Sequence, residues 1–289
     1  MGYAAREPAP DVGDEGFRFT HRDFERVRGL IHAHAGIALN PTKQRMVYSR
    51  LSRRLRLLGT RSFTAYLDDL EATPAGQGEW QEFVNALTTN LTSFFREPHH
   101  FPILATHIAE RAKRGGTVRI WCCAASTGEE PYTIAITAMQ ACRSRTPPVE
   151  ILATDIDTTV LGKAHDGVYA EEAVTRLDTD LLKSYFLRGR GPNAGFVKLQ
   201  DDVQALISYR PLNLLASSWH LEQKFDAIFC RNVMIYFDKD TQYRVLKGLA
   251  AALEPAGLLF AGHSENFTQA RDLFELLGRT VYRPVLPTR

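Results

Sequence analysis

The feature that most constrains the fold is a change of hydrophobic pattern at about residue 117. From there on, short apolar runs alternate with segments of helical spacing. The runs are VRIWCC, VEILATD, a stretch near ALISYR, FDAIFC, GLLFAG and TVYRPV. Such alternation is typical of βαβ units, which build a mostly parallel sheet with helices on its faces. The pattern therefore predicts an α/β fold for this part of the chain.

The preceding region has a helical pattern up to about residue 112. Thr20 is suited to cap a first helix that ends at Gly36. A second helix is predicted to begin with Asn40 as cap and Pro41 in the first turn, and to stop at Gly59. These signals predict an all-α region before the sheet.

A polar stretch between the second and third apolar runs contains RGRGPNAGFVKL, whose Gly and Pro residues favour turns. It interrupts the βαβ alternation, so we predict a small inserted subdomain of antiparallel strands. The predicted organisation is a flexible tail at 1–17, a basic helical domain at 18–89, and a cofactor-binding domain at 90–289 with the insertion at about 170–206.

The charge of the chain is distributed unevenly. The net charge is +2, yet residues 18–60 hold ten Lys or Arg against two acids, which leaves −6 for the remainder. Either this region faces an acidic partner or it is a solvated basic face.

The four cysteines include no C-x-x-C pair and are predicted to be reduced. No apolar run is long enough to span a membrane, so we expect a cytoplasmic protein without membrane insertion.

Ligands of open α/β sheets bind beyond the carboxyl ends of the strands, and three such ends carry suggestive residues. The turn AASTGEEPY leads into a helix that begins with Glu129 and Glu130. These acids would repel a diphosphate but complement the cationic groups of S-adenosylmethionine. Asp155 ends the second run and is suited to accept ribose hydroxyls, while Arg231 and Asn232 follow FDAIFC. Helix capping and turn formation are the alternative explanations.

Several segments together resemble the CheR family of chemotaxis-receptor methyltransferases over about residues 18–285. They are TTNLTSFFREPHHF, IWCCAASTGEEPYTIA, ATDID, PLNLL, FDAIFCRNVMIYFD and GLLFAGHSENF. The resemblance implies a class I, Rossmann-like, S-adenosylmethionine-dependent methyltransferase that esterifies glutamate side chains and releases S-adenosylhomocysteine. Its expected partners are the cytoplasmic domains of methyl-accepting chemotaxis receptors. In some members the β subdomain binds a receptor tail, and the sequence does not show whether this one does.

Site residues are expected as follows. The guanidinium of Arg96 offers a bidentate fork that can hold the acceptor carboxylate. Tyr236 either donates a hydroxyl near the methyl path or is a core aromatic residue. Glu129 and Glu130 stay open as alternatives for the cofactor, because adjacent helical residues point about 100° apart. No metal is expected. The expected cofactor contacts are Asn90, Thr92, Arg96, Glu130, Asp155, Asn213, Leu214, Arg231 and Asn232, and the expected receptor-docking residues are Arg50, Arg53, Arg54 and Arg56.

Three other functions are alternatives to this one. Basic helices would suit a nucleic-acid methyltransferase, but the fourth strand lacks the D/N/S-P-P-Y/F motif of amino-methylating enzymes, so no nucleic-acid partner is expected. A module that senses S-adenosylmethionine without catalysis keeps the same fold signals. A Rossmann dehydrogenase is disfavoured by the single glycine in ASTGEE.

Overall fold

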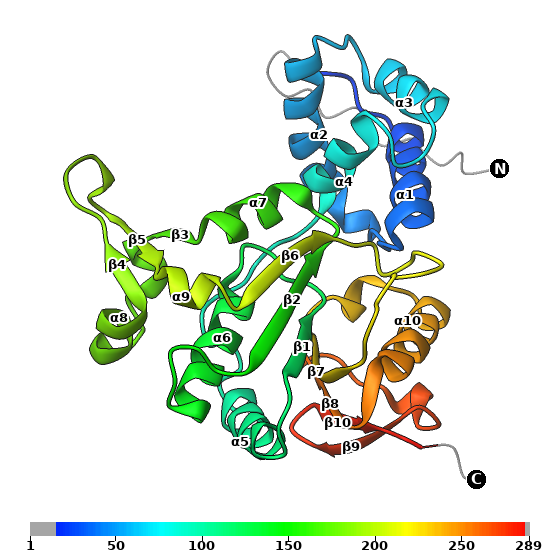
Figure 1. The fold of residues 1–289 in the computed structure, drawn as a ribbon. Coiled ribbons are helices and arrows are strands. Elements are labelled where there is room, and N and C mark those ends of the chain that lie inside the picture. The colour runs from blue at the N-terminus through cyan, green and yellow to red at the C-terminus, as the bar shows by residue number, and fades with distance from the viewer. Residues whose placement is uncertain (1–15, 287–289) are drawn as a thin grey trace, which may run out of the picture. The chain divides into compact units, whose positions relative to one another are not determined.

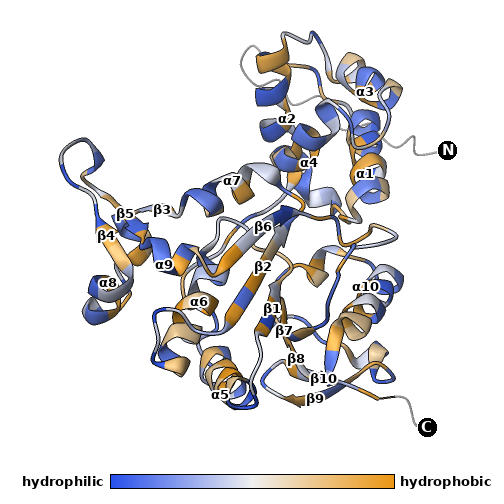
Figure 2. Cartoon of the chain, in the orientation of Figure 1, coloured by the Kyte–Doolittle hydropathy of each residue, from blue (hydrophilic) through white to orange (hydrophobic). Residues whose placement is uncertain are grey.

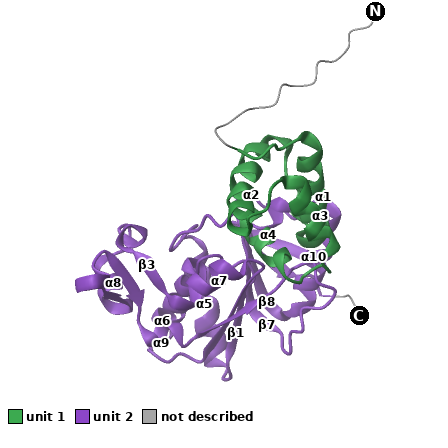
Figure 3. Cartoon of the chain, turned by 90° about the horizontal axis from the view of Figure 1, so that it is seen from above, with its two compact units in different colours: residues 1–88 green, residues 89–289 purple. Residues whose placement is uncertain are grey.

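The computed structural model describes residues 16–286, and the chain divides into two compact units (Figures 1 and 3). Unit 1 comprises residues 1–88 and unit 2 residues 89–289. Most of the predicted tail lies outside the described residues. Its last residue, Phe17, is described and packs edge-on against Phe63, with 6.1 Å between the ring centroids.

The described part of unit 1 is helical, as predicted, with α-helices and one short 3₁₀ turn. The elements are α1 (His21–Ala35), η1 (Pro41–Lys43), α2 (Gln44–Leu58), α3 (Phe63–Ala72) and α4 (Glu79–Leu87). The Thr20 side chain accepts the backbone N–H of Asp23 in a capping box, and Gly36 ends α1 with a φ of +70°. Asn40 caps the 3₁₀ turn that leads into α2. The predicted helix starts and stops are therefore confirmed.

Unit 2 is built on a seven-stranded sheet in the order β6-β2-β1-β7-β8-β10-β9. The first five strands of this order are parallel, and the last two pairings are antiparallel. The predicted α/β class is confirmed. The strands are β1 (Val118–Cys122), β2 (Val149–Asp155), β6 (Ile207–Pro211), β7 (Phe225–Cys230), β8 (Leu253–Ala261), β9 (Phe274–Gly278) and β10 (Val281–Pro284).

The hairpin of β9 and β10 was not predicted. Its turn places Arg279 and Thr280 at φ values of +49° and +60°, in the left-handed region that tight hairpin turns require. The usual sequence signal for such a turn is Asn-Gly or Asp-Gly. Because this chain uses Arg-Thr instead, the turn could not be recognised from the residues.

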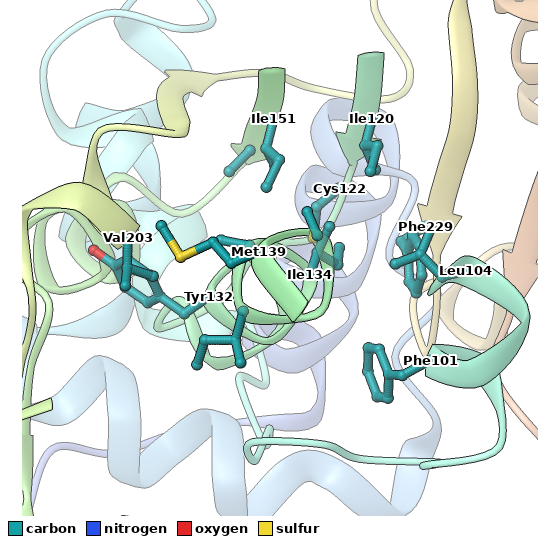
Figure 4. Packing of buried hydrophobic residues seen from close by; sticks show 14 of the residues in the cluster. Phe101, Leu104, Ile120, Cys122, Tyr132, Ile134, Met139, Ile151, Val203 and Phe229 are labelled. Atoms are coloured by element: carbon teal, nitrogen blue, oxygen red, sulfur yellow. The ribbon is translucent and has the colours of Figure 1, made fainter. Parts of the chain in front are cut away.

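The sheet separates two hydrophobic cores, because successive strand residues point to opposite faces. Ile120 and Cys122 of β1 join the core beneath α5 and α6 (Figure 4). Trp121 and Cys123 join the core beneath α10. Figure 2 shows β2 mainly as hydrophobic, as expected for a strand buried on both faces. The helices of unit 2 are α5 (His100–Lys113), α6 (Glu129–Cys142), α7 (Thr158–Asp166), α8 (Thr179–Tyr185), α9 (Asp201–Gln204) and α10 (Lys239–Ala252).

The predicted insertion is a three-stranded antiparallel sheet in the order β3-β5-β4. Its strands are β3 (Val168–Ala170), β4 (Phe186–Arg188) and β5 (Phe196–Leu199). The Gly- and Pro-rich stretch forms the connection between β4 and β5, as its composition predicts.

All four cysteines are free thiols. None of the helices within residues 16–286 is both long and apolar enough to cross a membrane.

Candidate active site

The turn after β1 brings backbone close to the neighbouring elements. Ser126 and Gly128 have φ values of +50° and +98°, and α6 starts directly after them. A Cβ atom on Gly128 would lie 2.7 Å from the Tyr169 hydroxyl and 2.9 Å from the Cα of Ala164. This position therefore needs glycine both for its backbone conformation and for space.

Asp155 lies at the carboxyl end of β2, buried but with part of its hydrogen-bonding capacity unused. Its Oδ2 accepts the N–H of Ser126 at 2.8 Å, and its Oδ1 accepts the N–H of Asp157 at 3.0 Å. Burial raises the pKa of Asp155 to about 6, and backbone hydrogen bonds from Asp157, Ser126 and Ile156 oppose that rise. A carboxylate has about four acceptor sites, so these bonds leave part of its capacity for a ligand. The residue is therefore suited to accept a ligand hydroxyl.

Arg231, at the end of β7, has a buried guanidinium that contacts protein groups. Its Nη1 lies 2.6 Å from Oε2 of Glu130, and its Nη2 donates to the Arg96 carbonyl at 2.6 Å. The same Nη2 lies 3.5 Å from Oε2 of Glu97. Arg231 thus joins the end of β7 to the start of α6 and to the segment that carries Arg96.

The two acids at the start of α6 have different partners. Glu130 pairs with Arg231 and also accepts from Sγ of Cys122 at 3.2 Å; burial raises the pKa of Glu130, and the guanidinium opposes that rise. Glu129 accepts the Thr127 hydroxyl at 2.6 Å, and burial raises its pKa. Glu130 already has a cationic neighbour, whereas the contact of Glu129 is with a neutral hydroxyl.

The segment before α5 brings further predicted residues to this edge. Nδ2 of Asn90 donates to Oδ2 of Asp157 at 2.8 Å, and the Ser126 hydroxyl donates to the Asn90 carbonyl at 3.1 Å. Nη1 of Arg96 donates to the Leu91 carbonyl at 2.8 Å. Asn90 is therefore adjacent to the ends of β1 and β2. Thr92 and Arg96 are half-buried in the same segment.

The remaining predicted residues follow β6 and β7. Oδ1 of Asn213 accepts the N–H of Leu215 at 2.8 Å, and Leu214 is buried. Asn232 is half-buried with a φ of +59°. Tyr236 is half-buried and packs against the core beneath α10. Among the described residues, no hydrogen bond joins Tyr236 to Arg96.

Sequence reasoning missed three acids of this site: Glu97, Asp157 and Glu265. Burial alone would raise the pKa of Glu97, but Arg231 and hydrogen bonds from His263 lower it overall. Asp157 caps α7 and contacts Asn90. Their partners are distant in sequence, so local patterns carried no signal for these contacts. The segments TTNLTSFFREPHHF, ATDID and GLLFAGHSENF of the resemblance did contain all three acids, but the resemblance assigned them no role.

Glu97, His99 and His100 place potential metal ligand atoms within 4.8 Å of one another. Nε2 of His100 lies 3.1 Å from the Arg279 carbonyl, and burial lowers the pKa of this histidine to about 4. A divalent cation here would stand beside the Arg231 guanidinium, whose charge repels it. It would also face the start of α5, where the helix dipole is positive. We therefore assign no metal to this cluster.

In unit 1, the four arginines of α2 that were expected to dock the receptor fall into two pairs. Arg50 donates to the carbonyls of Ala86 and Thr88 at the end of α4. Arg54 forms a two-pronged ion pair with Glu79, with both N–O distances at 2.6 Å. Arg53 and Arg56 are exposed. Both therefore present exposed positive charge, as does Arg45 of the same helix.

Two family models match the chain. Residues 22–88 match "CheR methyltransferase, all-alpha domain", and residues 90–283 match "CheR methyltransferase, SAM binding domain". The chain belongs to the CheR methyltransferase family. It is an S-adenosylmethionine-dependent methyltransferase, which confirms the predicted enzyme class, cofactor and fold.

Three curated relatives cover nearly the whole chain. Chemotaxis protein methyltransferase 2 of Pseudomonas aeruginosa is 52% identical, over 96% of this chain and 98% of its own length. Chemotaxis protein methyltransferase of Klebsiella aerogenes is 52% identical over 96% of each chain. That of Escherichia coli is 49% identical, over 90% of this chain and 89% of its own. The CheR resemblance read from the motifs is thus confirmed along the chain.

Proposed function

We propose that this CheR methyltransferase esterifies glutamate side chains on the cytoplasmic domains of chemotaxis receptors. Membership of the family supports the reaction class, and the names of the relatives support a role in chemotaxis. The observation that carries the proposal is the group of charged residues at the carboxyl ends of β1, β2 and β7. The enzyme works in the cytoplasm, where these receptor domains lie.

In this proposal the cofactor lies across the ends of these strands. Asp155 binds the two ribose hydroxyls, and Asn213 and Leu214 line the adenine. Asn90, Thr92, Arg96, Arg231 and Asn232 complete the contacts. An acid at the start of α6 complements the ammonium group. The resemblance indicates Glu130, while the Glu129 carboxylate contacts the neutral hydroxyl of Thr127. Separate Glu129→Gln and Glu130→Gln variants distinguish the two acids by their affinity for S-adenosylhomocysteine.

The chemistry suits an acceptor that needs no general base. A glutamate carboxylate has a pKa of about 4.3 and is ionised at neutral pH. S-adenosylmethionine supplies a methyl group on a positively charged sulfur when it is bound. The protein has to align the carboxylate oxygen with that methyl group and remove its water, and alignment alone contributes roughly 7–11 kcal/mol.

Arg96 is the residue proposed to hold the acceptor. One nitrogen of its guanidinium is used by the Leu91 carbonyl, which fixes the side chain while leaving other N–H groups for a carboxylate. Tyr236 is proposed to add a hydroxyl donor. An Arg96→Ala variant that kept both full turnover and full cofactor affinity would remove Arg96 from the mechanism.

The face of α2 is proposed to dock the acidic receptor surface. Arg53 and Arg56 supply the exposed charge, and Arg50 and Arg54 stabilise the helix that presents it. Electrostatic complementarity of this kind mainly increases association rates and depends on salt.

The proposed function is tested by incubating the protein with radiolabelled S-adenosylmethionine and receptor-rich membranes. We expect label on receptor bands that mild base releases as methanol, as a carboxyl ester requires. Membranes from cells without receptors serve as the control. Base-stable label, or label on nucleic acid in a filter-binding assay, would contradict the proposed acceptor.

A further inference from the structure

The turn that follows β8 holds the loop that follows β7. It consists of residues 262–265, the GHSE of the GHSENF segment, and the N–H of Glu265 donates to the Gly262 carbonyl at 2.9 Å. Glu265 is 4% exposed, yet the proposed contacts with cofactor and acceptor do not use it. A buried carboxylate needs strong partners, because burying an ionised group is costly.

Four backbone N–H groups supply those partners. Oε1 of Glu265 accepts from Val233 at 2.9 Å and from Met234 at 2.8 Å. Oε2 accepts from Asn232 at 3.0 Å and from Gly262 at 2.5 Å. A carboxylate has about four lone-pair sites. All of them are occupied here, so Glu265 has no acceptor capacity left for a ligand.

Gly262 allows this contact through its lack of a side chain. A Cβ atom on Gly262 would lie 2.4 Å from Nδ2 of Asn232 and 2.9 Å from the backbone nitrogen of the same residue. It would also lie 2.9 Å from Oε2 of Glu265. Two residues of the turn therefore determine where Asn232 lies.

The loop itself needs such support. Asn232 adopts a φ of +59°, which is uncommon for a residue with a side chain and costs energy unless the surroundings impose it. The N–H of Asn232 and those of the next two residues all point to one carboxylate. Charge-assisted bonds of this kind are stronger than neutral ones. They offset the strain and hold the Asn232 backbone in one conformation.

We propose that Glu265 is a positioning residue for S-adenosylmethionine, which acts by holding the loop after β7 so that Asn232 meets the cofactor. The proposal rests on the proposed function in one respect, the placement of Asn232 at the cofactor. Glu265 itself touches neither the cofactor nor the acceptor. Its role is to fix a ligand-binding backbone before the ligand arrives, which lowers the cost of binding.

The test is the Glu265→Gln variant, which keeps the shape of the side chain. An amide has one oxygen, so in either orientation its NH₂ group faces two N–H donors and pushes them away. The loop must move or leave donors unsatisfied. We expect the Kd for S-adenosylhomocysteine, measured by calorimetry, to rise on the order of tenfold. The KM for S-adenosylmethionine should rise by a similar factor, with a smaller change in kcat.

A matched control is available at the other end of β7. Asp226 is 5% exposed, and its Oδ2 accepts the N–H of Arg119 at 2.8 Å, while Arg111 pairs with the same carboxylate. Asp226→Asn therefore also removes the charge of a buried carboxylate that holds a backbone N–H. We expect this variant to lose thermal stability while its Kd for S-adenosylhomocysteine stays within twofold of the wild-type value.

Gly262→Ala tests the same contact from the other side. The added methyl group displaces Asn232, so the Kd should rise in the same direction, and this variant carries the test if Glu265→Gln does not fold. Folded Glu265→Gln or Gly262→Ala protein with wild-type Kd and KM would overturn the proposal. Failure of the proposed function looks different: the wild-type protein would then fail to bind S-adenosylhomocysteine or fail to methylate receptors.

Discussion

The carboxyl ends of β2 and β8 each lead to a buried carboxylate, and the two are used in different ways. Asp155 accepts the backbone N–H groups of Ser126 and Asp157 and has a further backbone hydrogen bond from Ile156, which still leaves acceptor capacity for a ligand hydroxyl. Glu265 accepts two backbone N–H groups on each oxygen, so it has no acceptor capacity left for a ligand. The number of internal partners thus separates an acid suited to bind a ligand from an acid that shapes the site around it.

The same distinction applies to the arginines of α2. Arg50 and Arg54 hydrogen-bond to groups of unit 1, while Arg53 and Arg56 are exposed, with the Arg56 guanidinium 5.9 Å from the centre of the Phe17 ring. A charged residue in a recognisable motif is therefore not enough to assign a role. Its internal partners decide whether it is available to another molecule.

The largest effect is expected from removing the carboxylate of Asp155. Asp155→Ala takes away the charge-assisted hydrogen bonding to the ribose, so the Kd for S-adenosylhomocysteine should rise on the order of 100-fold. Calorimetry on this variant and on the Asp226→Asn control measures the effect. A Kd within threefold of the wild type would break the distinction between Asp155 and Glu265.

The pH dependence of binding gives a second test. Burial raises the pKa of Asp155 to about 6, so the ligand-free protein protonates this carboxyl as the pH falls through that value. The ribose hydroxyls donate to the ionised form, so affinity should be highest above pH 6 and fall up to about tenfold per pH unit below it. An Asp155→Asn variant should show no such decline. Equal pH profiles for the two proteins would show that another group titrates.

A smaller, salt-dependent effect on receptor methylation is expected from the exposed Arg53 and Arg56 of α2. The Arg53→Glu, Arg56→Glu double variant should reduce receptor methylation roughly three- to tenfold at low salt, and less at high salt. The Kd for S-adenosylhomocysteine should not change. Arg271→Glu, an exposed charge reversal in unit 2, is the control. Equal losses in both variants would mean that overall charge, rather than this face, governs docking.

The smallest effect is expected for Arg54, whose guanidinium is already paired within unit 1. Arg54 and Glu79 form a paired contact with side chains 23% and 19% exposed. A double-mutant cycle with alanine should give a coupling of about 1 kcal/mol in the free energy of unfolding. Cofactor affinity should stay constant in all three variants. A coupling near zero would place Arg54 with the exposed arginines.

Much of the fold followed from the sequence because its signals are local. The alternation of apolar runs predicted β1, β2, β6, β7, β8 and β10, and the capping residues Thr20 and Asn40 predicted the helix starts of unit 1. The β9–β10 turn was missed because Arg279 and Thr280 are unusual in a left-handed conformation. Local physics thus predicts elements well where their residues follow common preferences.

The site was less predictable, for a related reason. Motifs pointed to Asp155, Arg231 and Asn232, but the partners of Arg231 lie in other elements, and Glu130 is 101 residues away in sequence. Glu265 is 33 residues from Asn232. Such contacts decide whether the hydrogen-bonding capacity of a charged side chain is used within the protein. They form only when the chain folds, so the sequence alone does not reveal them.

The most direct test of the account is a crystal structure of this protein with S-adenosylhomocysteine bound. We expect the ribose hydroxyls on the carboxylate of Asp155, while Glu265 keeps its four N–H partners and does not touch the ligand. A ligand bound away from the ends of β1, β2 and β7, or one held by Glu265 itself, would contradict the account.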